Sequence, residues 1–517
     1  MAKKVLVLGS GPAVIGQGGE YDHSGTMVLM GLREAGVEAV LLDSNAVTVV
    51  GDPALSARTY LEPVTAQTAE WIIEREKPDA LLAMVGGHSA LAIALQLSRS
   101  GVLKRHGVTL LGVSPETLSL CADRIAFGEF VRSKGMQAPG HALAITRDEV
   151  RTLASKLGLP LLARGPDAHE SGGARFVHEP EELDEVPLPV VLSQFLEHAV
   201  QADVDLVADA LGNTYVGGVM EHIEEAGVHA GDAACALPPY SLGPDVTEKL
   251  KDQATELARA LGVVGLCNVR FAVQGRSVTV LELNPRTSRT VPFVTRATQV
   301  PLAKIAAQCV AGRTLPELGY VREAPLKVVA IREAVFPFAR SAARDVLLGT
   351  QMQSTGSVVG ISDTHATAYA KAQLAAGMKF PEPGQAVFIS VRDEDKPAMV
   401  DLARRLRALG HDVLTTEGTC RYLTQKRIPT EQLVRVAHGS PNAVDLLRSG
   451  RIGMVINTPS DRPSALDSAK VRREAVILGV SYFTTANAAR MAVEALEALR
   501  SGKVTFMAVQ DGGAVRS

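Results

Sequence analysis

The stretch CNVRFAVQGRSVTVLELNPR, residues 267–286, contains two apolar runs on either side of a short Gln-Gly-Arg turn. Val, Phe and Leu recur in both runs, and the glycine marks the turn, so the stretch predicts a β-hairpin. The second run ends in Glu282, Asn284 and Arg286, and Arg270 stands within the first run. A carboxylate, an amide and two guanidinium groups are unusual in strands this apolar. The hairpin therefore predicts a polar site as well as a local fold.

The spacing of these side chains predicts which of them lie together. Residues two apart point to the same face of a strand, so Glu282 and Asn284 share a face. If the turn holds an odd number of residues, Asn268 and Arg270 lie on that face too. A carboxylate beside an amide oxygen suits Mg²⁺ or Mn²⁺ shared with nucleotide phosphates. A capped strand end with a surface ion pair explains the same spacing, so spacing alone leaves both interpretations open.

Length and composition predict a large cytoplasmic protein. The chain has 517 residues, of which 46% are hydrophobic and 21% are charged, and its formal net charge is −3. Such a length predicts roughly two to four domains. The mixed charges lack the pattern of a nucleic-acid or membrane-surface binder. The five cysteines form no CxxC pair, and neither a signal peptide nor a membrane-spanning run is apparent, so we expect a cytosolic protein without a disulfide framework or zinc site.

Three segments with different patterns divide the chain. Residues 1–115 alternate short β-runs with amphipathic helices, which is typical of a doubly wound parallel sheet. Residues 116–380 contain glycine-rich loops and the hairpin. After Pro381 and Pro383 the alternation starts afresh, and residues 381–517 have the size of one compact domain. We therefore predict an α/β protein with boundaries near residues 115 and 380.

The first glycine-rich loop, GSGPAVIGQG at residues 9–18, has the composition of a phosphate-binding turn. Four residues separate Gly11 from Gly16, so the loop does not match the GxGxxG pattern of dinucleotide-binding proteins. A nicotinamide cofactor is therefore not expected.

Two longer blocks resemble a known family. They are GGVMEHIEEAGVHAGDAACALPPYSL at 217–242 and LELNPRTSRTVPFVTRATQVPLAKIAA at 281–307, and VLVLGSGPAVIGQG near the N-terminus adds to them. The chain resembles the large subunit of carbamoyl phosphate synthetase, and more narrowly its C-terminal half, although RSGVLKRHGVTLLG at 99–112 is more similar to the first half. The resemblance implies a preATP-grasp domain, an ATP-grasp domain and an allosteric domain of the methylglyoxal synthase type, in the order of the three segments.

The activity that this resemblance implies is ATP-dependent phosphorylation of carbamate to carbamoyl phosphate, for pyrimidine and arginine biosynthesis. In the family one synthetase half makes carbamate and the other phosphorylates it, and this chain has room for one half. The implied partners are a glutaminase small subunit and an N-terminal synthetase half, in an oligomer.

The resemblance also implies roles for single residues. Arg124 and Arg164 would hold phosphates, since guanidinium forks match phosphate oxygens. Gln201 and His229 would belong to the same nucleotide site. The remaining implied roles are metal binding by Glu282 and Asn284, and positioning of the transferred phosphoryl group by Arg286 and Arg289.

Effector sites are implied as well. The block at 217–242 would help bind K⁺, and the ornithine positions match Glu224, Asp232, Glu333 and Thr484. The TTEGT loop at 415–419 offers hydroxyl and N–H groups suited to a phosphate. The implied nucleotide-monophosphate site comprises Ser390, Lys396, Thr416, Thr419, Arg435, Asn457 and Ser460. An ordinary α/β loop is the simpler interpretation of the same stretch.

Several departures from the family fall on nucleotide positions. Arg270 replaces a glutamine that helps hold the metal, and Gln201 replaces a glutamate that binds the ribose. The segment 164–173 is lengthened and acidic, and GGHS at 86–89 replaces GGQT. We expect Arg270 to pair with Glu282 in the absence of metal. Two hypotheses follow, a working ligase half and a catalytically impaired homologue that acts as a regulatory or scaffolding partner; an unrelated ATP-grasp ligase is a third.

Overall fold

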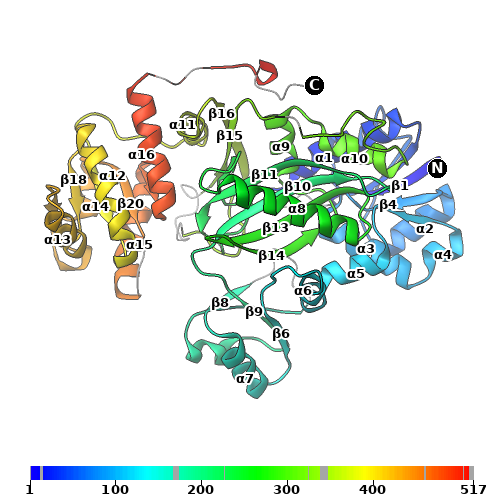
Figure 1. The fold of residues 1–517 in the computed structure, drawn as a ribbon, viewed down its shortest axis with the longest axis horizontal. Helices are drawn as coiled ribbons and strands as arrows, with labels where there is room; N and C mark the ends of the chain where they lie inside the picture. Colours follow the sequence, from blue (N-terminus) through cyan, green and yellow to red (C-terminus); the bar gives the residue numbers. More distant parts are fainter. Residues whose placement is uncertain are drawn as a thin grey trace.

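A computed structural model describes most of the chain, and four sheets form its framework (Figure 1). The described residues are 2–11, 16–166, 174–225, 227–323, 325–337, 347–458, 462–502, 504 and 506–511. Among them, no helix combines the length and the apolar character that crossing a bilayer requires.

The N-terminal sheet, at the right of Figure 1, is parallel throughout and has the order β3-β2-β1-β4-β5. Its strands are β1 (Lys4–Leu8), β2 (Glu38–Asp43), β3 (Arg58–Leu61), β4 (Ala80–Leu82) and β5 (Thr109–Leu111). The helical segments here are α1 (Gly18–Glu34), η1 (Val49–Gly51), α2 (Ala66–Glu76), α3 (Gly87–Arg99), α4 (Val102–His106) and α5 (Pro115–Ala122). The central strand is apolar and buried on both faces, as a parallel sheet between helix layers requires. The predicted doubly wound sheet is confirmed.

A small antiparallel lobe follows, at the bottom of Figure 1, with the strand order β6-β9-β7-β8. Its elements are α6 (Arg124–Ser133), β6 (His141–Ala144), α7 (Arg147–Leu157), β7 (Leu161–Arg164), β8 (Arg175–Val177), η2 (Pro180–Glu185) and β9 (Val190–Gln194). The apolar face of α7 packs on the sheet, and the lobe has its own small core.

The largest sheet is antiparallel and has the order β14-β13-β10-β11-β12-β15-β16. Its strands are β10 (Val200–Ala208), β11 (Thr214–Glu225), β12 (Cys235–Leu237), β13 (Gly265–Gln274), β14 (Ser277–Asn284), β15 (Val329–Val335) and β16 (Gly356–Ser362). The accompanying helices are α8 (Pro244–Ala260), α9 (Val291–Thr298), α10 (Leu302–Val310) and α11 (His365–Ala375). Alternate residues of β10 pack with α8 on one face and with α9 and α10 on the other. The second face joins this sheet to α1 of the N-terminal sheet.

The hairpin at 267–286 forms as β13 and β14, but its turn differs from the expectation. Gln274 pairs with Ser277, so the turn holds two residues, and Gly275 adopts a φ of 61°. An even turn alone would place Arg270 opposite Leu281. A β-bulge beside Arg270 adds one residue to β14 and restores the register, so that Arg270 lies opposite Glu282 and Asn268 opposite Asn284. The four polar side chains share a face because of the bulge, and the turn consists of Gly275 and Arg276 rather than of the three residues Gln-Gly-Arg.

The C-terminal sheet, at the left of Figure 1, is again parallel, with the order β19-β18-β17-β20-β21. Its strands are β17 (Ala386–Ser390), β18 (Val413–Thr415), β19 (Glu431–Gln432), β20 (Ile452–Asn457) and β21 (Ser481–Phe483). Its helical segments are η4 (Asp393–Asp395), α12 (Lys396–Ala408), α13 (Glu417–Gln425), η5 (Val436–His438), α14 (Ala443–Arg448), α15 (Arg462–Leu478), α16 (Ala486–Arg500) and η6 (Val509–Asp511). Helix α16 packs against α11, and one apolar cluster runs from the largest sheet into this domain.

We predict that limited proteolysis cuts the segment between α11 and β17. This segment is largely exposed and includes Glu382, Pro383 and Gly384, whereas β17 is buried. Gel electrophoresis should show a stable C-terminal fragment of about 14–15 kDa, the size of one compact domain. A resistant core consisting only of the intact chain, or cuts inside β17, would show that the boundary near residue 380 is wrong.

Candidate functional site

A cleft of about 910 Å³, counting the part open to solvent, lies between the small lobe and the edge of the largest sheet that β13 and β14 form. This volume is within the range of sites for nucleotide-sized ligands. The polar side chains that line it are Arg124, His141, Arg164, Ser193, Gln194, Gln201, His229, Arg270, Glu282 and Thr350. The apolar ones are Pro139, Leu162, Phe195, Leu196, Val228, Ala272 and Leu281.

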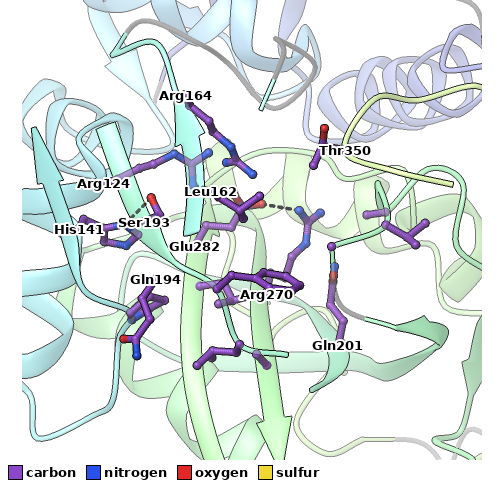
Figure 2. Close-up of a pocket in the computed structure, with 18 of the residues that line it drawn as sticks. Arg124, His141, Leu162, Arg164, Ser193, Gln194, Gln201, Arg270, Glu282 and Thr350 are labelled. Carbon is purple, nitrogen blue, oxygen red and sulfur yellow. Dashed lines mark hydrogen bonds and ion pairs between the residues drawn. The ribbon is translucent and has the colours of Figure 1, made fainter. Parts of the chain in front are cut away.

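Three arginines gather around one carboxylate in this cleft (Figure 2). The Nη1 atom of Arg270 lies 2.8 Å from Oε1 of Glu282, and Nη1 of Arg124 lies 3.9 Å from Oε2. Arg164 reaches toward the same region from β7, as Figure 2 shows. The expected pairing of Arg270 with Glu282 is confirmed. Cations outnumber the carboxylate among the lining side chains, so the cleft suits a ligand with several negative charges.

The electrostatic effect of the arginines is visible at His141. Burial, together with the guanidinium groups of Arg124, Arg132 and Arg164, lowers the pKa of His141 to about 4. Its Nδ1 atom lies 2.8 Å from the Ser193 hydroxyl (Figure 2). The imidazole is therefore neutral at physiological pH and leaves the positive charge of the cleft to the arginines.

Arg270 is also held from below the cleft. Its Nε–H donates to Oδ1 of Asp203 over 3.3 Å, and Nε2 of His222 lies 2.6 Å from Oδ2 of Asp203. Asp203 and His222 are both buried. Burial opposes their ionisation, but Arg270 and the hydrogen bond to His222 lower the pKa of Asp203, and the neighbouring Cys235 and Asp203 raise the pKa of His222. An ionised aspartate thus fixes the guanidinium from the protein interior.

A second buried acid organises the segment after β14. Asp205 accepts hydrogen bonds from the Asn268 amide at 2.9 Å, from the Ser288 hydroxyl at 2.9 Å and from the Thr290 hydroxyl at 2.5 Å. Burial raises the pKa of Asp205 to about 6 although these donors oppose the shift. Ser288 and Thr290 tie the loop that carries Arg289 to β10 in the middle of the sheet, and Asn268 ties β13 to the same aspartate.

Arg286 and Arg289 lie beside the cleft and have protein partners. Arg286 donates to Nε2 of His88 at 2.7 Å and to Oδ1 of Asn284 at 3.3 Å. Arg289 contacts Nδ1 of His229 at 3.2 Å. His88, which stands in the GGHS departure and lies on α3, thus connects the N-terminal domain to the hairpin site, and the Thr287 N–H adds a second contact by donating to the Met84 carbonyl.

The structure places the sequence-predicted nucleotide residues at one site. Arg124, Arg164, Gln201, His229 and Glu282 line the cleft. The other three expected residues contact residues of the cleft or one another. Asn284 bonds to Glu282, Arg286 to Asn284, and Arg289 to His229. The acidic loop within 164–173 lies mostly outside the described residues.

Sequence reasoning missed four residues of this site, Asp203, Asp205, His222 and His141. Asp203 and Asp205 are two residues apart in the apolar run of β10, and side chains two apart in a strand point to the same face. That signal was readable in the sequence. The contacts of His222 and His141 depend on strand pairing and had no local signal.

The expected metal ligands do not fit a divalent ion as they are arranged. Oε1 of Glu282 already binds Arg270 and accepts a hydrogen bond from the Asn284 amide at 3.2 Å. Oδ1 of Asn284 accepts from Arg286. A Mg²⁺ or Mn²⁺ ion between these two oxygens would have to displace one guanidinium and lie beside another.

A second cluster of expected residues lies at the carboxyl ends of the C-terminal strands. The Thr416 hydroxyl lies 3.2 Å from that of Ser390, and the Asn457 amide donates to the Ser390 carbonyl at 2.9 Å. Thr419 is buried, and its hydroxyl accepts from the backbone N–H of Val391. A Cβ added to Gly418 would meet the Lys396 ammonium at 3.2 Å, so Lys396 lies at the start of α13. Arg435 is exposed, and Ser460 lies outside the described residues.

The expected ornithine residues include a close pair of carboxyl groups. Burial raises the pKa of Glu224 to about 7, and burial together with Glu224 raises the pKa of Glu333 well above its ordinary value. The Gln373 amide donates to Glu333 at 2.7 Å. Asp232 is buried and accepts hydrogen bonds from two backbone N–H groups, and Thr484 precedes α16.

Comparison with known proteins relates this architecture to one family. Residues 1–120 match the carbamoyl phosphate synthase preATP-grasp domain, residues 123–318 match the carbamoyl-phosphate synthase L chain ATP binding domain, and residues 398–484 match the MGS-like domain. The chain is 44% identical over 518 residues to the carbamoyl phosphate synthase large chain of Myxococcus xanthus, covering 98% of this chain and 47% of that protein. The chain belongs to the carbamoyl phosphate synthase large-chain family.

Further relatives agree with this assignment. The large chains of Xylella fastidiosa and Methanothermobacter thermautotrophicus are 41% and 39% identical to the chain, covering 97% and 98% of it. The chain spans about half the length of the curated relatives it matches, 47% and 48% in these two cases. The three domain types expected from the resemblance are confirmed.

Known structures share the fold of the first two domains. A biotin carboxylase–β-γ-ATP complex from Campylobacter jejuni has a TM-score of 0.56 at 13% identity and covers 72% of this chain and 91% of its own. An N5-carboxyaminoimidazole ribonucleotide synthetase from Thermotoga maritima has a TM-score of 0.54 at 14% identity, covering 72% and 98%. At these identities the likeness shows the fold alone.

We predict that Glu333→Gln stabilises the chain at pH 8. A carboxyl group whose folded pKa is raised keeps its proton in the folded state while the unfolded chain releases it above about pH 4.5, so stability falls as pH rises through this window. A tenfold difference in proton affinity between the folded and the unfolded chain corresponds to about 1.4 kcal/mol. The glutamine keeps the shape and the hydrogen bond from Gln373 and removes this cost.

Thermal unfolding followed by circular dichroism at pH 4 and pH 8 measures the effect. The variant should melt several degrees higher than the parent at pH 8, with a much smaller difference at pH 4. Glu129→Gln, at an exposed position of α6, is the control and should leave both midpoints unchanged. A Glu333→Gln protein that is less stable than the parent at pH 8 would contradict the buried-pair account.

Proposed function

We propose that the chain binds ATP in the cleft and transfers its γ-phosphoryl group to carbamate, as the C-terminal half of a carbamoyl phosphate synthase large chain. The observation that carries this proposal is the gathering of Arg124, Arg164 and Arg270 in a cleft with one carboxylate and an apolar end. Guanidinium groups bind phosphate oxygens in pairs and keep their charge, and phosphoryl transfer depends mainly on such positioning and neutralisation.

The apolar end of the cleft suits the adenine ring, and the arginine end suits the phosphates. Leu162 on β7 and Phe195 and Leu196, in the connection from β9 to β10, offer apolar surface for the adenine ring. The amide side chains of Gln194 and Gln201 offer donors and acceptors for the sugar and the base edge. The arginine end then receives the phosphates.

The acceptor end of the reaction lies toward the loop after β14. Arg289 and His229 face each other at the wall of the cleft, and Arg286 is fixed by Asn284 and His88. In this position Arg289 and Arg286 hold carbamate and the transferring phosphoryl group. His141 is neutral and adds no positive charge to the cleft. Glu282 and Asn284 are bound by guanidinium groups, so the residues that neutralise the phosphates here are arginines and not the ligands of a divalent ion.

The wider role follows from the family. Because the chain is about half of its relatives, we infer that it works with an N-terminal synthetase half and a glutaminase subunit in a cytoplasmic oligomer, for pyrimidine and arginine biosynthesis. The cluster around Ser390 and Thr416 would bind a nucleotide monophosphate, and the pair Glu224 and Glu333 would bind the amine of ornithine. A cation between these two carboxyl groups would offset the cost of their ionisation.

A second candidate function is nucleotide-dependent regulation without turnover. The observation that favours it is the ion pair between Arg270 and Glu282, because this pair occupies the carboxylate that a catalytic metal would need. In that case the chain would bind nucleotide and act as a regulatory or scaffolding partner of an active synthetase.

The reverse reaction tests the two functions. A working half makes ATP from ADP and carbamoyl phosphate, which luciferase detects directly. Arg164→Ala should lower this rate by tenfold or more, since it removes a phosphate-binding guanidinium at the cleft, whereas Arg276→Ala should leave it unchanged. Arg276 is a matched control because it lies on the hairpin turn and its side chain is 90% exposed.

The outcomes separate the candidates. ATP formation that depends on Arg164 and not on Arg276 supports the ligase half. Absence of ATP formation by a folded chain that still binds ADP supports the regulatory role, and a chain that binds no adenine nucleotide contradicts both.

A further inference from the structure

Arg270 lies between two carboxylates at the wall of the nucleotide cleft. Its Nη1 atom is 2.8 Å from Glu282 on β14, and its Nε atom is 3.3 Å from Asp203 on β10. The side chain is 19% exposed and lines the cleft. Figure 2 shows it reaching up to Glu282, opposite Arg124 and Arg164.

This arrangement fixes the guanidinium in place. Asp203 is 1% exposed and is held by His222 over 2.6 Å. If Arg270 turned away, the buried Asp203 would lose one of its two partners and keep only His222, and breaking a buried ion pair is costly. Arg270 therefore does not move aside easily for another cation.

The oxygens available to a divalent ion here are already bound by guanidinium groups. Arg270 and Arg124 both approach Glu282, and Arg286 donates to Asn284. An ion that binds Glu282 must displace Arg270 and then remain within a few ångströms of its charge. Like charges this close repel, whereas phosphate oxygens carry the opposite charge and are attracted by the same guanidinium groups.

We propose that Arg270 takes the place of a divalent cation at Glu282, so that the cleft binds a nucleoside polyphosphate in its metal-free form. The phosphate oxygens contact Arg124, Arg164 and Arg270, which all line the cleft, and Glu282 orients Arg270 rather than binding a metal. This inference rests on the proposed nucleotide site and specifies which form of the nucleotide that site selects.

Calorimetric titration of the full chain with ATP tests the proposal in two buffers, one with EDTA and one with excess Mg²⁺. The parent protein should bind ATP in EDTA, and Mg²⁺ should leave the affinity unchanged or lower it. Arg270→Gln should bind metal-free ATP at least tenfold more weakly and MgATP about tenfold more tightly, which corresponds to about 1.4 kcal/mol. The matched control, Arg276→Gln on the same hairpin, should behave like the parent in both buffers.

A second variant covers the case in which Arg270→Gln does not fold. Arg270→Lys keeps the charge, so it should keep the preference for metal-free ATP, and circular dichroism confirms folding of each protein before titration. A parent that binds ATP tenfold or more tightly with Mg²⁺ than with EDTA, together with an unchanged preference in Arg270→Gln, overturns the proposal and leaves the proposed ligase function standing. A parent that binds ATP in neither buffer overturns the nucleotide site itself, and with it both proposals.

Discussion

The ion pair between Arg270 and Glu282 is the interaction around which the nucleotide cleft is built. It joins the two strands of the edge hairpin, and it depends on a single extra residue in β14 that brings the two side chains opposite each other. At an effective dielectric of about 20, unit charges 4 Å apart attract by about 4 kcal/mol, much of which desolvation offsets. Its main consequence is therefore electrostatic, because it places a fixed positive charge where the phosphates of a nucleotide would lie.

The fold supports this charge from both sides. On the cleft side the small lobe supplies Arg124 and Arg164, and on the interior side β10 and β11 supply Asp203 and His222. Beyond β11 the sheet continues through β12 to β15. There an apolar cluster joins the sheet and α11 to the C-terminal domain. The parallel N-terminal sheet and the C-terminal domain thus both pack against the large antiparallel sheet, in a chain that spans about half the length of its relatives.

Much of this was predictable from local sequence patterns, and the rest depended on pairing between distant strands. Apolar runs and helical spacing predicted the order of the domains. The resemblance to the family predicted that Arg124, Arg164 and Gln201 belong to one nucleotide site, and all three line the cleft. The bulge at the hairpin was not predictable, because an odd turn and an even turn with a bulge give the same facing side chains. The buried hydrogen bonds of Asp205 and His222 were missed for the same reason, since their partners lie more than ten residues away in the chain.

Anomalous diffraction from crystals grown with Mn²⁺ and a non-hydrolysable ATP analogue tests the central claim most directly, because it locates the nucleotide and every bound divalent ion in one measurement. The account predicts the analogue in the cleft, its phosphates in contact with Arg124, Arg164 and Arg270, and no manganese peak at Glu282. A manganese ion that bridges Glu282 and a phosphate, with Arg270 turned away from both, would contradict it.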